Sequence, residues 1–575
     1  MTTPKSRSIV GFCLAFVVTL GAAQSLAESI TQFPPRISYV RGQYFKNNPK
    51  AWAEFLASMP RAGGGQVEPA AQNGTPKFGG TWTALTDAPG QLGNPLLLTD
   101  GTVMVQQAGT EKWSKLTPDI NGSYANGTWS DLASLPVING TQYAPLYHSS
   151  AVLPDGRVLI MGGEYNGFVP IWTNLGAIYD PIANAWTPVP HPPGWGTFAD
   201  GTGVIGDAQG IVLANGTYLQ GACCLLPAGN ALLDAATLTW TETGAPRFGN
   251  FYQDEQGYNL LPSGKILTLD IWTDFDFNNG SSSGNSTNTE LYNPNAGIWA
   301  AGADTPVSMI DPFECANFEV GPAVMRPDGT LVQFGGNTGC AAVPKPDPTA
   351  IYNTVTGTWS AGPDVPIACG KFKNRRCDLA DAPAAILPNG NILFAASAGY
   401  GGSPTHFFEF GADNIVKQVA DTQVHAQHSG AFFYNFLVLP NGEILSTDFS
   451  TTAEVYTPTG TPNPAWAPKI TVFPPTVSAG VSYPISGSQF NGLSQGAGYG
   501  DDVQGATNYP LVRITNNSTG HVFYARTASH STMSIAPHTK GSTTFAVPAS
   551  IETGASMLEV VANGIASTAV AIEVN

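Results

Sequence analysis

The sequence predicts an all-β fold with more than one domain, and three observations support this. The chain has 575 residues, which is longer than a single hydrophobic core normally serves. It contains 65 glycines and 46 prolines but only 11% charged residues. Stretches rich in β-branched and aromatic residues alternate with Gly, Pro and Asn turns, as is typical of all-β proteins. We therefore expect one large domain and one smaller domain.

The balance of charge excludes two classes of partner. The chain carries 24 Lys and Arg against 41 Asp and Glu, which gives a formal net charge of −17. Nucleic acid and anionic membrane surfaces repel such a protein because both carry dense negative charge. We expect no nucleic-acid partner, whereas a glycan or small-molecule ligand is compatible with this charge. The sequence does not determine the oligomeric state.

Residues 1–27 have the composition of a secretory signal peptide. Lys5 and Arg7 provide the basic start, Ile9–Ala23 the apolar run, and Ser25–Ala27 a small-residue cleavage site. The alternative, an uncleaved anchor, is disfavoured because the apolar run is shorter than the roughly 18 residues that span a membrane. We expect a secreted or periplasmic protein with no transmembrane segment after cleavage.

Residues 28–78 are interpreted as an N-terminal extension and linker. One short helix is predicted over Pro49–Met59, because Trp52, Phe55 and Leu56 fall on one face at positions i, i+3 and i+4. The Gly, Gln and Pro-rich stretch Ala62–Pro76 has the composition of a linker.

A strand–turn–strand unit recurs after residue 79. Its clearest copy is Ala144–Glu164, in which small and apolar residues lead into a Pro-Asp-Gly turn and an apolar strand follows. This pattern predicts a β-hairpin. The turn, a residue followed by Gly, occurs seven times at intervals of 48 to 65 residues: Asp100, Asp155, Asn215, Ser263, Asp328, Asn389 and Asn441.

A tryptophan strand that leads to a proline is the second marker of the repeat. It occurs at Trp82, Trp129, Trp186, Trp240, Trp299 and Trp359, and a seventh position near Val416–Gln423 lacks the tryptophan. Repeats of this length predict a seven-bladed β-propeller over residues 79–466. The first tryptophan strand precedes the first turn, and no tryptophan strand follows the last turn. We therefore expect the N-terminal strand to complete the last blade and close the ring.

The repeat stops after Thr457, and a second domain follows. Residues 467–575 alternate strands with Gly, Asn and Ser turns, which predicts an immunoglobulin-like β-sandwich. Within it, the Gly, Asp and Gln-rich stretch Gly492–Asn508 is interpreted as an insertion rather than a linker.

The repeat resembles the kelch motif, because Gly-Gly, Tyr and Trp recur at about 50 residues. In three repeats the tyrosine precedes the tryptophan by seven residues: Tyr179, Tyr292 and Tyr352. A kelch propeller followed by such a sandwich resembles galactose oxidase and its relatives, copper-radical oxidases with a C-terminal early-set domain. The resemblance covers roughly residues 80–575. The stretches YPLVRI and GHVFYAR further resemble a group of bacterial secreted kelch proteins.

The resemblance implies roles for two residues and leaves others unmatched. The segment YHSSAVLPDGRV, from Tyr147, resembles the segment with that family's cross-linked tyrosine. The segment RTASHSTMS resembles the hairpin whose histidine reaches the copper, so His530 is its match. The family also needs a cysteine in the first blade, but Gln91–Asp100 has none. It needs a Tyr-His pair before the last turn, where this chain has Phe433 and Tyr434.

Acidic residues recur where the inner strands are expected to begin. Eight residues before each turn the chain has Leu92, Tyr147, Asp207, Glu255, Val320, Asp381 and Phe433. Glu319 adds an acid one position earlier. Because propellers bind ligands where these strands begin, the acids predict a rim that holds Ca²⁺ or accepts hydrogen bonds from sugar hydroxyls. The alternative is that they cap loop backbones or face solvent.

Histidines near this rim are further candidates. His148 is a candidate ligand-binding residue, although an extended backbone would turn only one of Tyr147 and His148 to the channel. His425 and His428 are candidate metal ligands, but such a pair shares a metal only on a helical turn. The alternative for both is a hydrogen-bonding loop histidine. His530 is likewise either a metal ligand or an ordinary loop residue.

The cysteines predict disulfides. An even number follows the signal peptide: Cys223, Cys224, Cys315, Cys340, Cys369 and Cys377. In an exported protein this favours disulfides. Sequence proximity favours the pairs 369–377 and 315–340. The adjacent cysteines 223 and 224 form either a vicinal disulfide or two thiols.

The favoured function is an exported propeller that binds a glycan or another extracellular ligand at the acidic mouth, with or without a metal. The alternative is a copper-dependent carbohydrate or alcohol oxidase with an altered active site. A second alternative is a structural or adhesive module. Copper and calcium are the two cofactors considered, and the sequence does not decide whether the protein is an enzyme.

Overall fold

The computed structural model describes a nearly all-β chain, with 43% of residues in strands and 2% in helices. This confirms the prediction of an all-β fold. The described residues are 50, 78–198, 201–225, 228–246, 253, 256–271, 275–276, 281–282, 287–310, 319–336, 346–366, 369, 377–399, 402–500 and 505–575. The predicted signal peptide, the linker and all but one residue of the predicted helix lie outside these ranges.

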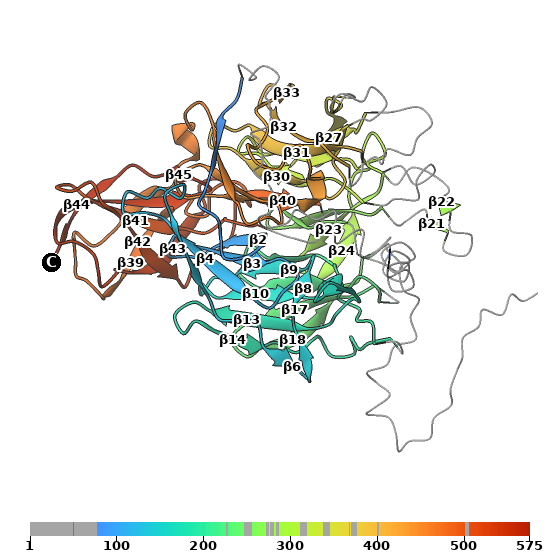
Figure 1. The fold of residues 1–575 in the computed structure, drawn as a ribbon, viewed down its shortest axis with the longest axis horizontal. Coiled ribbons are helices and arrows are strands. Elements are labelled where there is room, and N and C mark those ends of the chain that lie inside the picture. Colours follow the sequence, from blue (N-terminus) through green and yellow to red (C-terminus); the bar gives the residue numbers. More distant parts are fainter. Residues whose placement is uncertain are drawn as a thin grey trace, which may run out of the picture.

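Antiparallel four-stranded meanders, which we call units, make up most of the chain (Figure 1). Unit 1 contains β2–β5 (Leu92–Leu97, Val103–Gln107, Trp113–Thr117, Thr128–Asp131). Unit 2 contains β9, β10, β13 and β14 (Ser149–Val152, Val158–Met161, Gly176–Asp180, Ala185–Pro188). Unit 3 contains β15–β18 (Gly210–Val212, Tyr218–Gly221, Asn230–Asp234, Thr239–Thr243).

The next three units follow the same order of strands. Unit 4 contains β19, β20, β23 and β24 (Asn259–Leu260, Ile266–Leu269, Thr289–Asn293, Ile298–Ala301). Unit 5 contains β25–β28 (Ala323–Met325, Thr330–Phe334, Thr349–Asn353, Thr358–Ala361). Unit 6 contains β30–β33 (Pro383–Ile386, Ile392–Ala398, Thr405–Phe410, Val416–Gln418).

Unit 7 joins the two ends of the repeat region. It contains β34–β36 (Asn435–Val438, Ile444–Thr447, Glu454–Thr457), and its fourth strand is β1 (Thr81–Ala84). The register places Trp82 opposite Tyr456 and Ala84 opposite Glu454. This pairing agrees with the prediction that the N-terminal strand completes the last unit.

Short strands decorate the units. They are β6 and β7 (Val137–Ile138, Thr141–Gln142), β8, β11 and β12 (Pro145–Leu146, Tyr165–Asn166, Val169–Pro170), β21 and β22 (Phe275–Asp276, Ser281–Ser282) and β29 (Cys377–Asp378). The described residues also form two short 3₁₀ helices, η1 (Ala431–Phe433) and η2 (Pro464–Trp466).

The recurrent x-Gly turns join the first two strands of every unit. The glycine has a positive φ in all of them, for example +76° at Gly101 and +88° at Gly329. This left-handed conformation favours glycine because it lacks a Cβ atom. The residue before it accepts a hydrogen bond from the backbone two positions on, as Asp100 does from Thr102 (3.2 Å). The repeat therefore follows from turn geometry.

The recurrent tryptophans connect neighbouring units. The indole of Trp186 in unit 2 donates to the carbonyl of Ala133 beside unit 1 (2.9 Å). Equivalent bonds run from Trp129 to Thr86 (3.0 Å) and from Trp82 to Ala420 (2.7 Å). The indole also packs on the tyrosine seven residues earlier, with ring centroids 5.0 Å apart in the pair with Tyr179. Burial of an indole requires such a partner for its N–H group.

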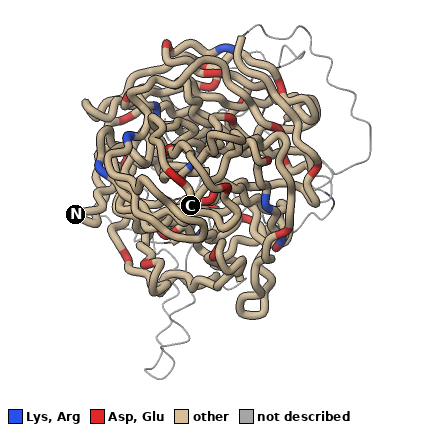
Figure 2. The backbone as a smooth tube through the Cα atoms, turned by 90° about the vertical axis from the view of Figure 1, so that its left-hand side faces the viewer, with Lys and Arg blue, Asp and Glu red and all other residues tan. Residues whose placement is uncertain are grey.

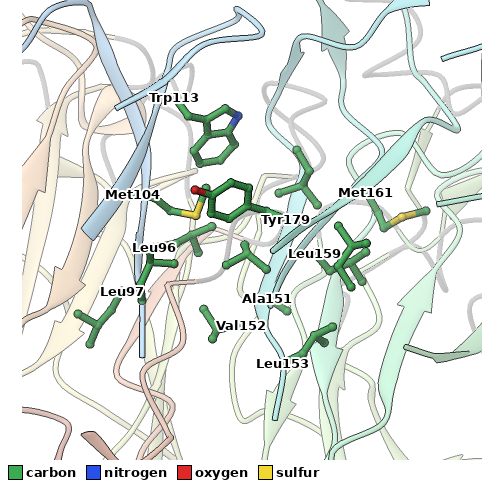
Figure 3. Packing of buried hydrophobic residues seen from close by; sticks show 14 of the residues in the cluster. Leu96, Leu97, Met104, Trp113, Ala151, Val152, Leu153, Leu159, Met161 and Tyr179 are labelled. Atoms are coloured by element: carbon green, nitrogen blue, oxygen red, sulfur yellow. The ribbon is translucent and has the colours of Figure 1, made fainter. Parts of the chain in front are cut away.

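The core of the repeat region lies between adjacent units. Figure 3 shows Leu96, Met104 and Trp113 of unit 1 facing Ala151 and Tyr179 of unit 2. All of these side chains are at most 4% exposed. Facing sheets of adjacent units thus bury each other, as the alternating apolar strands predicted.

The C-terminal domain is one continuous sheet folded over its own core. Its strands are β37–β39 (Lys469–Val472, Thr476–Val477, Ser482–Ser488), β41–β43 (Leu511–Asn516, Val522–Ala528, Lys540–Ala546) and β44–β46 (Gly554–Ala562, Ile565–Ala566, Val570–Val574). Val512, Phe545 and Leu558 belong to its buried core. Figure 2 views the molecule from this side and shows acidic and basic positions dispersed over the fold.

The C-terminal domain packs on the x-Gly turns. Arg526 pairs with Asp100 at 2.5 Å, and the backbone of His530 donates to Pro154 (3.0 Å). A Cβ atom on Gly101 would lie 2.5 Å from the ring of Tyr524. Gly101 and Gly156 therefore permit both a left-handed turn and a close contact with the C-terminal domain.

One strand of the C-terminal domain lies away from the rest. β40 (Ala497–Tyr499) pairs antiparallel with the inner strand β30 of unit 6, with Tyr499 opposite Pro383. In Figure 1 it lies beside β30, away from β39. Within the predicted insertion Gly492–Asn508, β40 therefore enters the space between the inner strands, which we call the bore.

Candidate functional site

We call the end of the inner strands opposite the x-Gly turns the mouth. Tyr147 lies there, between β8 and β9, and its backbone has a φ of +51°. Asp381, at the equivalent position of unit 6, has a φ of +55°. Left-handed backbone at such residues costs about 1 kcal/mol and persists only where the surroundings impose it. The mouth is thus locally constrained at two of the predicted positions.

Aromatic side chains gather on one half of the mouth, and we call them the mouth aromatic cluster: Tyr147, Tyr165, Phe168, Phe432, Phe433, Phe449 and Tyr499. They come from units 2 and 7 and from the C-terminal domain. The rings of Tyr165 and Phe449 lie 6.1 Å from that of Tyr147, inclined by 63° and 33°. Tyr147, Phe168 and Phe432 are partly exposed. The cluster is therefore partly accessible to solvent.

Tyr499 reaches this cluster through the bore. Its ring stacks on that of Tyr147, with centroids 6.2 Å apart and planes 18° apart. Its hydroxyl donates to the carbonyl of Phe432. Glycines alternate with larger residues in this stretch, and a Cβ on Gly498 would lie 2.9 Å from the carbonyl oxygen of Ala323. Glycine therefore permits the strand to fit between units 5 and 6.

A narrow polar crevice runs beside this strand. It lies between residues 494–500 and units 4 and 5, and its lining includes Gln256, Tyr258 and Gln333. Gln333 donates to the carbonyl of Gly321 (2.8 Å), so its amide helps to hold the beginning of the inner strand of unit 5.

His148 is the most unusual polar residue of the mouth. It is 1% exposed, and neither ring nitrogen has a hydrogen-bond partner within the described part of the chain. Burial lowers its pKa to about 3, so the imidazole is neutral at physiological pH. The adjacent Ser149 and Ser150 are both bonded, to Ala208 (2.6 Å) and Asn94 (2.9 Å). His148 is therefore a buried neutral base beneath the mouth.

The predicted acidic rim consists of buried or half-buried carboxylates. Asp207 is 4% exposed and Glu319 is 1% exposed, whereas Asp381 is half-buried. All three take part in interactions within the protein. Glu255 lies outside the described residues. These acids thus lie at the mouth level of different units, and Asp207 and Glu319 sit below the surface.

His425 belongs to a separate acidic group in unit 7. Its Nδ1 lies 3.0 Å from a carboxylate oxygen of Asp448. Burial lowers the pKa of His425, but hydrogen bonding and charge attraction from Asp448 outweigh it, and the pKa is raised overall. Burial also raises the pKa of Glu454 to about 7. His428 is exposed, and its backbone bonds to His425 (2.9 Å). The two histidines are thus on one turn but in different environments.

His530 lies at the opposite end of β9 from Tyr147. It is 7% exposed, its Nδ1 is 3.0 Å from the Thr543 hydroxyl, and its ring stacks on Tyr509. Burial lowers its pKa to about 4. Its backbone bonds to Pro154, seven residues beyond Tyr147. At about 3.3 Å per residue the two candidates are roughly 20 Å apart.

A copper ion does not fit the residues that the family resemblance matched. Tyr147 is surrounded by aromatic rings, and the spacing of Tyr147 and His530 rules out a shared ion. Among the described residues, no three His, Cys, Asp or Glu side chains lie close enough together to hold a metal ion. We therefore derive no step through copper or calcium.

Two disulfides are present among the described residues. Cys369 pairs with Cys377, as sequence proximity predicted. Cys223 pairs with its neighbour Cys224, and both are fully buried at the mouth end of unit 3. Of the two alternatives for this adjacent pair, the structure thus has the disulfide. Cys315 and Cys340 lie outside the described residues. Within the described residues no helix is long and apolar enough to cross a membrane.

Sequence reasoning missed Tyr499 and Phe449. Phe449 lies two residues beyond the buried strand β35 of unit 7, at the far end of that strand from the repeated x-Gly turn. Tyr499 lies in the insertion between β39 and β41, which is outside the repeat. The one available signal was the alternation of glycine in Gly496–Gly500, which is typical of close backbone approach.

Comparison with known proteins supports the repeat assignment. A model of the kelch motif matches residues 145–193, which cover most of unit 2. Kelch-like protein terF from Aspergillus terreus is 25% identical over 258 residues, which are 42% of this chain and 48% of that protein. The match thus spans about half the length of this curated relative.

Solved structures with similar folds include YjhT, with a TM-score of 0.35 and 14% identity, covering 58% of this chain and 99% of that chain. The WD40 β-propeller domain of Doa1 has a TM-score of 0.35 and 9% identity, covering 66% of this chain and 97% of that chain. The chain is thus similar to kelch-repeat proteins over residues 145–193 and to a kelch-like protein over 258 residues.

Proposed function

We propose that this kelch-repeat protein is an exported, non-redox binding protein that holds a glycan at its mouth. The observation that carries the proposal is the mouth aromatic cluster, with Tyr147, Phe168 and Phe432 partly exposed. The apolar face of a sugar ring packs on an aromatic ring, while its hydroxyls reach nearby polar groups. A site of aromatic side chains with a few polar groups is typical of small-molecule binding.

The proposal includes a closed seven-bladed ring over residues 79–466. Seven units support it, and inner strands of successive units lie against each other, including β34 of unit 7 against β2 of unit 1. It also includes an immunoglobulin-like, early-set sandwich over residues 467–575. The continuous sheet folded over one core supports that part.

Export to the periplasm or the extracellular space is also part of the proposal. Its support is the composition of residues 1–27 together with the two disulfides. Structural disulfides persist in oxidising compartments and are rare in the cytosol.

The polar part of the proposed site comes from the rim. Asp381 is half-buried and belongs to unit 6. The inner strand β30 of this unit pairs with β40, the strand that contains Tyr499. A carboxylate at this position would accept hydrogen bonds from sugar hydroxyls. The copper oxidase alternative is not favoured, because Tyr147 and His530 lie at opposite ends of β9.

A glycan array with the purified mature protein tests the proposal. We expect binding to one family of oligosaccharides, and an at least tenfold loss of affinity in Tyr147→Ala. Tyr483→Ala is the matched control, because Tyr483 is also a half-buried tyrosine but lies in the C-terminal domain. Absence of any glycan signal, or equal binding by wild type and Tyr147→Ala, would overturn the proposal.

A second measurement separates the proposal from the oxidase alternative. Copper content and peroxide release are measured on a panel of sugars and alcohols. We expect no tightly bound copper and no turnover. Stoichiometric copper together with peroxide release would replace the proposed function with the oxidase.

A further inference from the structure

We propose that the C-terminal domain fixes the orientation of the ligand-binding ring of Tyr147 at the mouth, because its Tyr499 packs against that ring from inside the bore. The inference rests on the proposed function, in which Tyr147 contacts the ligand. Tyr499 is a positioning residue in this account, since it is only 5% exposed whereas Tyr147 is partly exposed.

The contacts of Tyr147 single out Tyr499. Three aromatic rings surround Tyr147, and those of Tyr165 and Phe449 meet it at 63° and 33°. Tyr499 alone among the three stacks nearly parallel, at 18°. A stacked ring fixes the plane of its neighbour, whereas inclined rings chiefly limit its rotation. The orientation of the Tyr147 face therefore depends on where Tyr499 is held.

Tyr499 is held on both sides of the bore. Its hydroxyl donates to Phe432, which belongs to the same mouth aromatic cluster. Its strand pairs with β30, and the backbone of Gly500 donates to Ala382 (3.1 Å). A Cβ on Gly498 would lie 2.9 Å from Ala323. The strand thus fits between two units with no room for lateral displacement.

The same segment is anchored to the C-terminal domain. Asn563, next to the end of β44, donates to the hydroxyl of Thr507 (3.1 Å). The backbone of Thr507 in turn donates to Gln495 (2.7 Å), whose side chain accepts from Leu260 of unit 4 (2.8 Å). These hydrogen bonds therefore link the C-terminal domain, through Thr507 and Gln495, to the inner strand of unit 4.

This arrangement couples two events by thermodynamic necessity. If docking of the bore segment favours the binding orientation of Tyr147, a bound ligand favours docking by the same factor. The C-terminal domain would then influence the affinity of the mouth for its ligand through Tyr499, which does not itself contact the ligand.

The test labels Tyr147 with 3-fluorotyrosine in the full-length mature protein and follows its ¹⁹F NMR line without ligand. We expect Tyr499→Leu to shift and broaden the line, and Tyr499→Phe, which keeps the ring, to restore most of the wild-type line. Gly498→Ala should shift the line as well, because its methyl group would press on Ala323. Gly541→Ala is the matched control, since its Cβ would make ordinary 3.4 Å contact with Phe490.

A wild-type line in both Tyr499→Leu and Gly498→Ala would overturn the inference. Gly498→Ala adds one methyl group only, so the test remains decisive if Tyr499→Leu fails to fold. The readout needs no ligand, so its failure is distinct from failure of the glycan proposal. For an oligosaccharide selected by the array, we expect Tyr499→Leu to weaken binding at least fivefold and Tyr499→Phe to restore it.

Discussion

The two ends of strand β9 differ in almost every respect. At the turn end, Pro154 and Gly156 follow the repeat and are covered by the C-terminal domain. At the mouth end, Tyr147 departs from the repeat, has left-handed backbone and lies among partly exposed rings. One end of the strand is a structural contact, and the other is free to differ between units. A histidine lies near each end, His148 and His530, and burial lowers the pKa of both.

The comparison separates stability from recognition. Turn ends repeat because a left-handed glycine and a close domain contact leave few alternatives. Mouth ends vary because the repeated turn does not constrain them: unit 2 has Tyr147 there, whereas unit 6 has Asp381. Substitutions at the turn end should therefore act on folding, and those at the mouth end on binding.

The largest expected effect is at a covered turn. Gly101→Ala should lower the free energy of unfolding by about 3 kcal/mol, because it adds left-handed strain and a clash with Tyr524. Gly329→Ala should cost about 1 kcal/mol, because its φ is also positive but its Cβ would be 3.6 Å from the nearest atom. Urea denaturation measures both. Equal losses would contradict the account of the domain contact.

The two disulfides of the described residues lie at the mouth end, and removing each one measures how much it stabilises the protein. Replacing Cys369 and Cys377 by Ser should cost about 2.5 kcal/mol, as expected from the entropy of closing a loop of this length. Replacing Cys223 and Cys224 should cost less by this entropic term, because adjacent residues close almost no loop. Calorimetric melting of the two double variants decides the order. A larger loss at the adjacent pair would contradict it.

Substitutions near the two ends of β9 should have opposite effects on stability and on glycan affinity. His530→Ala should lower the free energy of unfolding by about 2 kcal/mol, since it removes a buried ring and its bond to Thr543, and it should leave glycan affinity unchanged. Tyr147→Ala should do the reverse. Melting and glycan titration of both variants check this, and loss of binding in His530→Ala would contradict the separation.

The smallest expected effect is on pH dependence. The pKa values of His148 and His530 are lowered to about 3 and 4, so the unfolded chain binds two more protons there at about pH 5 to 6. The raised pKa of Glu454, about 7, makes the folded chain bind one more. The net difference is one proton, so stability should fall by about 1.4 kcal/mol per unit as pH drops through this range.

Glu454→Gln sharpens that prediction. Of the three groups, only Glu454 reduces the loss of stability as the pH drops. Without its proton, the slope of the free energy of unfolding against pH should double to about 2.8 kcal/mol per pH unit. Denaturation midpoints at several pH values measure the slope. An unchanged slope would show that Glu454 is ionised in the folded chain.

The sequence predicted the fold well wherever local backbone geometry determines which residue can occupy a position. The x-Gly turns, the outer tryptophans and the closing strand β1 all follow from rules that act within or between neighbouring strands. The candidate site was less accessible, because it assembles residues from distant segments. The family match placed His530 near Tyr147, but the C-terminal domain brings Tyr499 there instead and leaves His530 at the turn end. Only the alternation of glycine in Gly496–Gly500 indicates which part of the insertion lies close to other backbone.

The most direct test of the central claim is a calorimetric titration of an array-selected oligosaccharide into metal-free protein. The account predicts that the wild type binds after chelation of metals, and that Tyr147→Ala loses at least tenfold in affinity while His530→Ala does not. Binding that vanishes on chelation, or that is equal in wild type and Tyr147→Ala, would contradict a metal-free aromatic site at the mouth.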